Sequence, residues 1–109
     1  VSLHWGNEYE TTQNLNQEKI ARALIDAGAQ LIIGHHPHVV QPVEEYNGGY
    51  IVYSLGNFVF DQNFSPDTKT SLVLKVTLKD KKVSQVEQSR VAFTSLYQPY
   101  LISSKNTSK

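Results

Sequence analysis

The chain has 109 residues, a hydrophobic share of 39%, and ten basic side chains that balance ten acidic ones, which predicts no more than one globular domain. The zero net charge argues against a nucleic-acid-binding surface or an acidic-membrane-binding surface, because such surfaces are strongly basic. The absence of cysteine excludes disulfide bonds, thiolate metal sites and cysteine nucleophiles.

The first residues are strand-like, and methionine is absent throughout the chain. We therefore expect a piece of a longer protein, with any targeting segment upstream of it. No apolar run in the sequence reaches the length that a membrane-spanning helix needs.

Residues 1–3 predict a buried strand, and a polar loop follows them. A helix is then expected over residues 16–27, with Asn16 as the N-cap, Glu18 in the first turn and Gly28 as the stop. The apolar residues that we assign to a hydrophobic staple and to the buried stripe of this helix are Leu15, Ile20, Ala21, Ala23, Leu24 and Ala27.

Residues 31–33 predict a second buried strand, which Gly34 ends by letting the chain bend. Strand, helix and strand with short links indicate a parallel β-α-β unit. All four histidines of the chain follow these two strands: His4 the first, and His35, His36 and His38 the second. Ligands of open α/β sheets bind at the carboxyl ends of the strands, so the sequence predicts a site there.

The rest of the chain predicts antiparallel hairpins. One spans residues 39–58 with a turn at Asn47, and the other spans residues 70–93 with a turn at residues 79–82. The predicted fold class is therefore mixed α/β. The polar residues 103–109 are expected to be a disordered tail. In the second hairpin, alternation predicts that one face is buried, namely Leu72, Leu74, Val76 and Leu78.

Neutral imidazole is a common ligand of divalent metals. His36 and His38, on either side of Pro37, can aim two rings at one ion, and His4 can supply a third. The alternative is that these histidines are ordinary surface or core residues. Two-metal hydrolysis also needs bridging carboxylates. Because no aspartate follows either early strand, we expect the histidines to form only part of a metal centre.

Several neighbouring residues have two interpretations each. Glu8 either orients an imidazole from behind or is a solvated loop carboxylate. Asn57 either reaches the site or belongs to a structural turn, and Trp5 and Tyr9 either line a groove or pack over the sheet. Ser54 is disfavoured as a nucleophile, because it lacks the turn that activated serines use.

The stretches "HWGNEY" and "GHHPHVVQP", with "YSLGNFVFD" at this spacing, resemble the C-terminal part of the bacterial CapA/PgsA capsule-synthesis family, over residues 1–78. That family is linked to poly-γ-glutamate capsules. The resemblance implies the C-terminal part of a calcineurin-like metallophosphoesterase α/β sandwich, with residues 1–102 as the domain portion and residues 103–109 as the tail.

The resemblance also implies site residues. His4 corresponds to the lone histidine of that fold's metal site, and His36 and His38 correspond to its His-x-His pair. His35 replaces the glycine of the motif, so its role as ligand, supporting residue or substrate contact is open. We take His35 and Asn57 as candidate catalytic residues, Asn57 because "SLGNF" is a family hallmark. Since the upstream aspartate and asparagine motifs are absent, the divalent metal site is expected to be incomplete and the isolated chain inactive.

Two functions follow from the resemblance. The parent protein is either a metal-dependent hydrolase that cleaves a phosphoester or a polymer amide at the cell surface, or a non-enzymatic scaffold of the capsule machinery. A soluble α/β domain with incidental histidines is the third interpretation. Expected partners are the poly-γ-glutamate polymer, capsule synthase subunits and, through an exposed sheet edge, a second copy. Nucleic acid is not expected. The implied location is extracellular, with a membrane anchor upstream.

Overall fold

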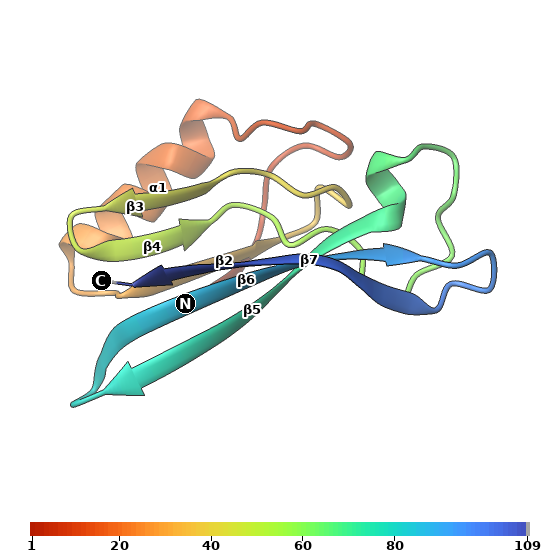
Figure 1. Cartoon of the computed structure of the whole chain (residues 1–109). Coiled ribbons are helices and arrows are strands. Elements are labelled where there is room, and N and C mark those ends of the chain that lie inside the picture. Colours follow the sequence, from red (N-terminus) through yellow and green to blue (C-terminus); the bar gives the residue numbers. More distant parts are fainter. Residues whose placement is uncertain (109) are drawn as a thin grey trace.

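The computed structural model describes the backbone of residues 1–108 and the side chains of residues 1–103, and it contains two β-sheets and one α-helix (Figure 1). The mixed α/β class is confirmed. Within the described residues, no helix is long and apolar enough to span a membrane. In chain order the elements are β1 Ser2–His4, α1 Leu15–Asp26, β2 Leu31–His35, β3 Val43–Tyr46, β4 Gly49–Val52, the short 3-10 helix η1 Asp67–Lys69, β5 Thr70–Lys79, β6 Lys82–Phe93 and β7 Pro99–Ser108.

The first sheet has the strand order β1-β2-β4-β3. The predicted β-α-β unit is confirmed, because β1 and β2 are parallel and α1 connects them. Their register sets His4 opposite His35. Strand β4 is also parallel to β2, and β3 pairs with β4 as an antiparallel hairpin. The hairpin turn has positive φ angles at Asn47 and Gly48, as a type I′ turn requires.

The N-cap of helix α1 lies two residues earlier than the sequence predicted. The N-cap is Asn14, not Asn16: Asn14 Oδ1 accepts a hydrogen bond from the Gln17 backbone N at 2.9 Å, and Gln17 Oε1 accepts one from the Asn14 backbone N at 2.9 Å. Such a reciprocal pair satisfies two backbone donors at once. The predicted staple is wrong, since Leu15 is 74% exposed. Gly28 follows the helix with φ 116°, as predicted for its stop.

The first sheet is covered on both faces, in layers that Figure 1 shows from the side. Helix α1 packs on one face, where Ala21 and Ile25 contact Ile32, Ile51 and Tyr53. The second sheet packs on the other face, where the buried residues are Tyr50, Val83 and Val86. Strand β4 is therefore buried throughout, which explains why its sequence is a continuous apolar run.

Gly34 does not end its strand, because β2 continues to His35. It serves close packing instead: a Cβ at Gly34 would collide with the Tyr53 carbonyl and the Trp5 indole. Trp5 Nε1 donates a hydrogen bond to that same Tyr53 oxygen at 2.8 Å. Trp5 therefore packs over the sheet, which is the second of its two predicted interpretations.

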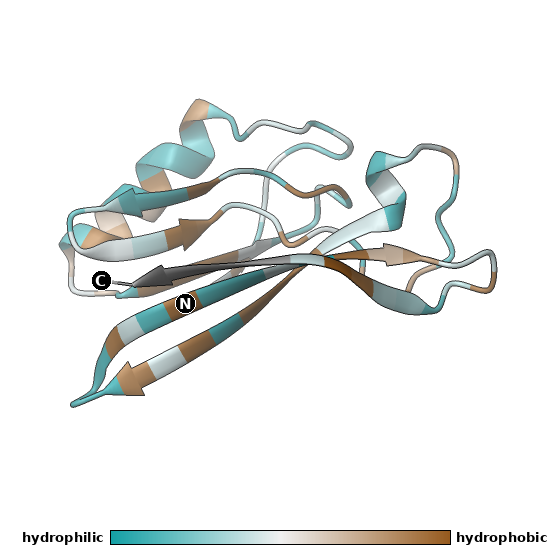
Figure 2. Ribbon diagram, viewed as in Figure 1, coloured by the Kyte–Doolittle hydropathy of each residue, from teal (hydrophilic) through white to brown (hydrophobic). Residues whose placement is uncertain are grey.

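The second sheet has the order β5-β6-β7 and is antiparallel. The β5–β6 hairpin is confirmed, and Figure 2 shows apolar and polar residues alternating along it. Its buried face ends before the turn, because Leu78 is 66% exposed.

The sequence predicted a disordered tail over residues 103–109. The backbone of β7 continues to Ser108 along β6, since backbone pairing needs no apolar side chain. Lys109 lies outside the described residues.

Candidate metal centre

The five candidate site residues line one pocket of about 330 Å³ beyond the carboxyl ends of β1 and β2. The structure therefore gathers these side chains at the sheet edge where the sequence predicted a site. These side chains come from the end of β1, from the end of β2 and the segment that follows it, and from the segment after β4. The pocket is lined by His4, His35, His36, His38, Gly56, Asn57, Phe58, Val59 and Phe60.

The loop that carries His36 and His38 has an uncommon backbone. His36 has φ 106° and His38 has φ 64°, while Pro37 between them is buried. A residue before proline normally adopts a negative φ in the extended region, so this geometry could not be predicted from the residues alone. Non-glycine residues with such φ values are strained by about 1–3 kcal/mol each, and they cluster at functional sites.

The loop after β1 is held against the histidine loop by its backbone. Trp5 N donates to His35 O at 3.0 Å, and Tyr9 N donates to Pro37 O at 2.7 Å. A buried pair supports this loop from behind: Gln17 Nε2 donates to Gln41 Oε1, and Gln41 Nε2 donates to the carbonyl of Glu10, each at 2.9 Å. These bonds fix where Glu8 lies.

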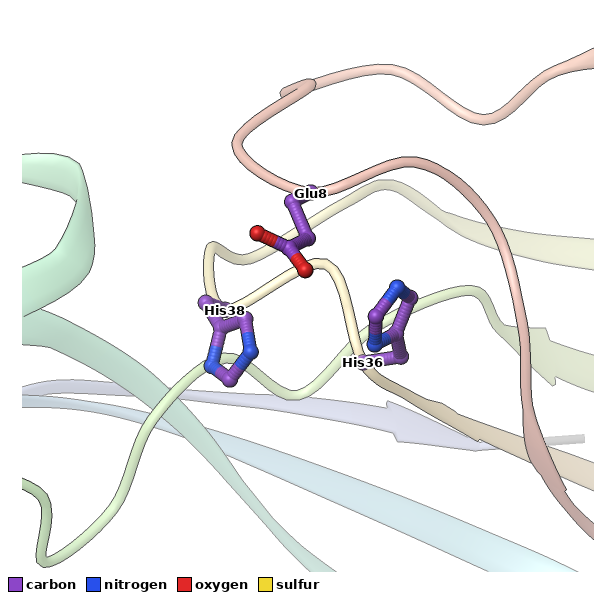
Figure 3. Close-up of side chains that lie close together, drawn as sticks. All are labelled: Glu8, His36 and His38. Carbon is purple, nitrogen blue, oxygen red and sulfur yellow. The ribbon is translucent and has the colours of Figure 1, made fainter.

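Glu8, His36 and His38 come together from two loops (Figure 3). One potential ligand atom from each lies within 4.8 Å of the other two. Glu8 is exposed and both histidines are partly buried. One carboxylate and two imidazoles match a common donor set of catalytic zinc sites, which leave a further coordination position open. The donor chemistry therefore fits a divalent ion.

His4 and His35 are near this cluster but outside it. The His4 and His36 rings lie 4.4 Å apart between centroids, yet His4 supplies none of the three clustered atoms. His35 is exposed and also lines a second, mostly apolar pocket between the two sheets, together with Ile33 and Leu72. The structure thus separates the predicted set into His36 and His38, which join Glu8, and His4 and His35 on the pocket wall.

Asn57 reaches the site through His38. Its side chain is 7% exposed, and Asn57 Oδ1 lies 2.9 Å from His38 Nδ1. Asn57 Nδ2 donates to Gln62 Oε1 at 3.0 Å and to Thr68 O at 3.1 Å. Every polar atom of this side chain is therefore engaged by the protein.

Aromatic rings surround His38. The rings of Tyr9 and Phe60 lie 5.9 and 5.6 Å from it, and Phe64 contacts Tyr9 edge-on at 4.8 Å. Tyr9 thus packs beside His38 without lining the pocket, so neither of its two interpretations is decided. Ser54 is fully buried, and its Oγ accepts a hydrogen bond from Gly56 N at 3.2 Å, so it contributes to the turn.

Sequence reasoning missed Glu8 as a member of the cluster. The signal was present, because Glu8 stands four residues after His4 in the loop that follows β1. Its position over His36 and His38 depends on backbone bonds between two loops far apart in the chain, and these bonds leave no local pattern. Gln62 and Thr68 were missed for the same reason.

Comparison with known proteins identifies the family of this chain. Residues 1–62, which include Glu8, all four histidines and Asn57, match the family described as bacterial capsule synthesis protein PGA_cap. The chain belongs to this family. The sequence resemblance to capsule-synthesis proteins is thereby confirmed.

Three relatives illustrate the similarity. The PGA biosynthesis protein CapA of Bacillus subtilis is 49% identical over 87 residues, which are 80% of this chain and 23% of that protein. The capsule biosynthesis protein CapA of Bacillus anthracis is 50% identical over 80 residues, 73% of this chain and 19% of that protein. A probable polyglutamine synthesis accessory protein of Mycobacterium tuberculosis is 38% identical over 61 residues, 56% of this chain and 16% of that protein. The chain thus spans about a fifth of the length of the two Bacillus relatives.

Proposed function

We propose that this chain contributes a divalent-metal site to a hydrolase of capsule synthesis, and that Glu8, His36 and His38 hold the ion. The observation that carries the proposal is the convergence of these three donors within 4.8 Å at the carboxyl edge of the first sheet. The proposed ligand set differs from the set that the sequence indicated, because the third ligand is Glu8 and not His4.

The remaining pocket residues have roles that suit such a site. A bound ion would polarise the scissile group of a substrate and lower the pKa of a bound water. His4 and His35 are exposed on the pocket wall, where an imidazole can give a proton to a leaving group or accept one. Phe58, Val59 and Phe60 form an apolar side of the pocket, although all three side chains are exposed.

The substrate that we propose is poly-γ-glutamate or a phosphorylated precursor of it. The names of the Bacillus relatives connect them with PGA and capsule biosynthesis. A polyanion is attracted to a cationic centre, and this chain carries no net charge of its own that would oppose it. Action at the cell surface, with capsule synthase subunits as partners, remains part of the same proposal.

A scaffold function is the second candidate, and one observation favours it. The cluster contains a single carboxylate, whereas two-metal hydrolysis uses bridging carboxylates and further ligands. The Mycobacterium tuberculosis relative is described as a probable accessory protein. In this alternative, the metal holds the polymer in place and no bond is cleaved.

Hydrolysis and polymer retention distinguish the two candidates. The whole protein that contains this chain is loaded with Zn²⁺ or Mn²⁺ and assayed on a phosphomonoester, a phosphodiester and a γ-glutamyl peptide, and on immobilised poly-γ-glutamate. Turnover of one substrate class that is lost in the His36→Ala/His38→Ala variant supports the hydrolase. Metal-dependent retention of the polymer without turnover supports the scaffold. Neither metal binding nor polymer retention would contradict both.

A further inference from the structure

The orientation of the Asn57 amide is decided by its surroundings. The Thr68 carbonyl oxygen only accepts hydrogen bonds, so the Asn57 atom 3.1 Å from it must be the amide nitrogen. The amide oxygen then faces the His38 ring, 2.9 Å from Nδ1. An oxygen acceptor at this distance requires a proton on Nδ1.

That proton has a consequence for the other ring nitrogen. In neutral imidazole only one nitrogen carries hydrogen, so Nε2 keeps its lone pair. We infer that Asn57 is a positioning residue that selects the Nδ1–H tautomer of His38 and so makes Nε2 the atom that binds the metal. This inference rests on the metal site proposed above. It replaces the sequence-based assignment of Asn57 as a catalytic residue.

The Asn57 side chain is well held for this role. Thr68 is fully buried, and its Oγ1 donates to the Ser65 carbonyl at 2.8 Å at the start of η1. Gln62 accepts the second amide hydrogen and donates to Tyr9 Oη at 3.2 Å. Tyr9 adjoins Glu8 in the chain, so the hydrogen bonds that orient His38 extend to the loop that carries the third ligand.

A purely structural role for Asn57 makes a different prediction. In that case the bonds of Nδ2 to Thr68 and Gln62 are what matters, and any substitution that removes Nδ2 has the same effect. In the positioning role, the Oδ1 acceptor matters. Asn57→Asp and Asn57→Leu separate the two roles, because both remove the amide donor but only Asn57→Asp keeps an acceptor for His38 Nδ1.

The tautomer is read directly from the imidazole nitrogens. The ¹⁵N NMR spectrum of metal-free protein is recorded at a pH where the ring is neutral, for wild type, Asn57→Leu, Asn57→Asp and the control Asn63→Leu, since Asn63 is exposed and bonds Tyr97 away from the site. Wild type, Asn57→Asp and Asn63→Leu are expected to show His38 with hydrogen on Nδ1. Asn57→Leu is expected to shift the population toward hydrogen on Nε2. Unfolding in urea confirms that each variant is folded.

Calorimetric titration with Zn²⁺ completes the test. Loss of a partner that orients a metal-binding histidine typically costs 10–100-fold in affinity, and that loss is expected for Asn57→Leu but not for Asn63→Leu. Hydrogen on Nε2 in wild type would overturn the inference even if Zn²⁺ binds. Equal tautomer populations in Asn57→Leu and Asn57→Asp would also overturn it. The expected tautomer without any Zn²⁺ binding by wild type would instead overturn the proposed metal site, and with it the ligand role given to Nε2.

Discussion

At the scale of single residues, His36 and His38 show how the site departs from ordinary backbone preferences. Both have positive φ angles, which a side chain with a Cβ adopts at a cost. Such strain persists where the surrounding structure over-determines it, and here the buried Pro37 and the Tyr9 N to Pro37 O bond do so. The side chains at these positions therefore serve the site and not the fold.

The substitution His36→Gly tests whether the backbone at position 36 is strained. Glycine adopts positive φ without a Cβ penalty. The free energy of unfolding of metal-free His36→Gly is therefore expected to exceed that of His36→Ala by about 1 kcal/mol, as measured by urea unfolding. Both variants are expected to lose Zn²⁺ binding. Equal stability of the glycine and alanine variants would show that the backbone at position 36 is unstrained.

At the scale of elements, the N-cap of α1 is the point where the structure differs from the sequence prediction. Asn14 and Asn16 are both plausible caps by residue type, and only the reciprocal bonds with Gln17 identify Asn14. Gln17 is also buried and bonded to Gln41. The cap is therefore joined to the network that holds the Glu8 loop, a tertiary constraint that a local pattern does not contain.

Two alanine substitutions test the cap. Asn14→Ala is expected to lower the free energy of unfolding by about 1 kcal/mol, because the helix loses its N-cap. Asn16→Ala is the matched control, since Asn16 lies exposed within the helix, and a change below about 0.5 kcal/mol is expected for such a site. Urea unfolding of the metal-free chain measures both. A larger effect at Asn16 than at Asn14 would contradict Asn14 as the N-cap and support Asn16 instead.

A bidentate ion pair joins α1 to β3. Arg22 Nε and Nη2 donate to the two carboxylate oxygens of Glu44 at 3.1 and 2.8 Å, and Tyr53 Oη donates to Glu44 at 3.4 Å. The Arg22 hydrogen bonds hold the pKa of the Glu44 carboxyl below its ordinary value of 4.5. Burial of the Tyr53 ring raises the pKa of its hydroxyl to about 12, so this hydroxyl stays a donor at neutral pH.

The lowered pKa of Glu44 predicts how stability changes with acid. Because the unfolded carboxyl takes up its proton at a higher pH than the folded one, the contribution of Glu44 is complete above its ordinary pKa. This contribution is lost as pH falls through the lowered pKa of the folded state. Urea unfolding of wild type and Glu44→Gln is therefore expected to show a difference at neutral pH that shrinks in acid. A difference that is constant across this range would contradict the role of the pair.

At the scale of the whole molecule, local patterns predicted most of the fold. The β-α-β unit and both hairpins follow from short apolar runs and turn residues such as Asn47 and Gly48. The predicted buried stripe of α1 is only partly right, because Ala21 is buried but Ile20, Ala23 and Ala27 are exposed. Local patterns did not predict β7, whose backbone pairs with β6 up to Ser108 although residues 103–108 are polar. They also placed His36 and His38 at the correct sheet edge, yet not Glu8, whose position depends on contacts between loops.

The candidate metal centre and Asn57 bring together parts of the chain that are distant in sequence. Glu8 belongs to the loop after β1, His36 and His38 to the loop after β2, and Asn57 to the segment between the two sheets. Leu72 N donates to Leu55 O at 2.8 Å close to that segment, where β5 of the second sheet meets the first. An ion bound by two of these loops is therefore expected to stabilise the fold as a unit.

Urea unfolding with and without Zn²⁺ tests the metal site most directly. A ligand that binds only the folded state at about 100 times its Kd adds about 2.7 kcal/mol to the free energy of unfolding. We expect a stabilisation of that order for wild type and for Glu10→Gln, a nearby exposed carboxylate outside the cluster. Glu8→Gln, His36→Ala and His38→Ala are expected to lose most of it. No stabilisation of wild type, or equal stabilisation of the Glu8→Gln variant, would contradict a metal centre formed by Glu8, His36 and His38.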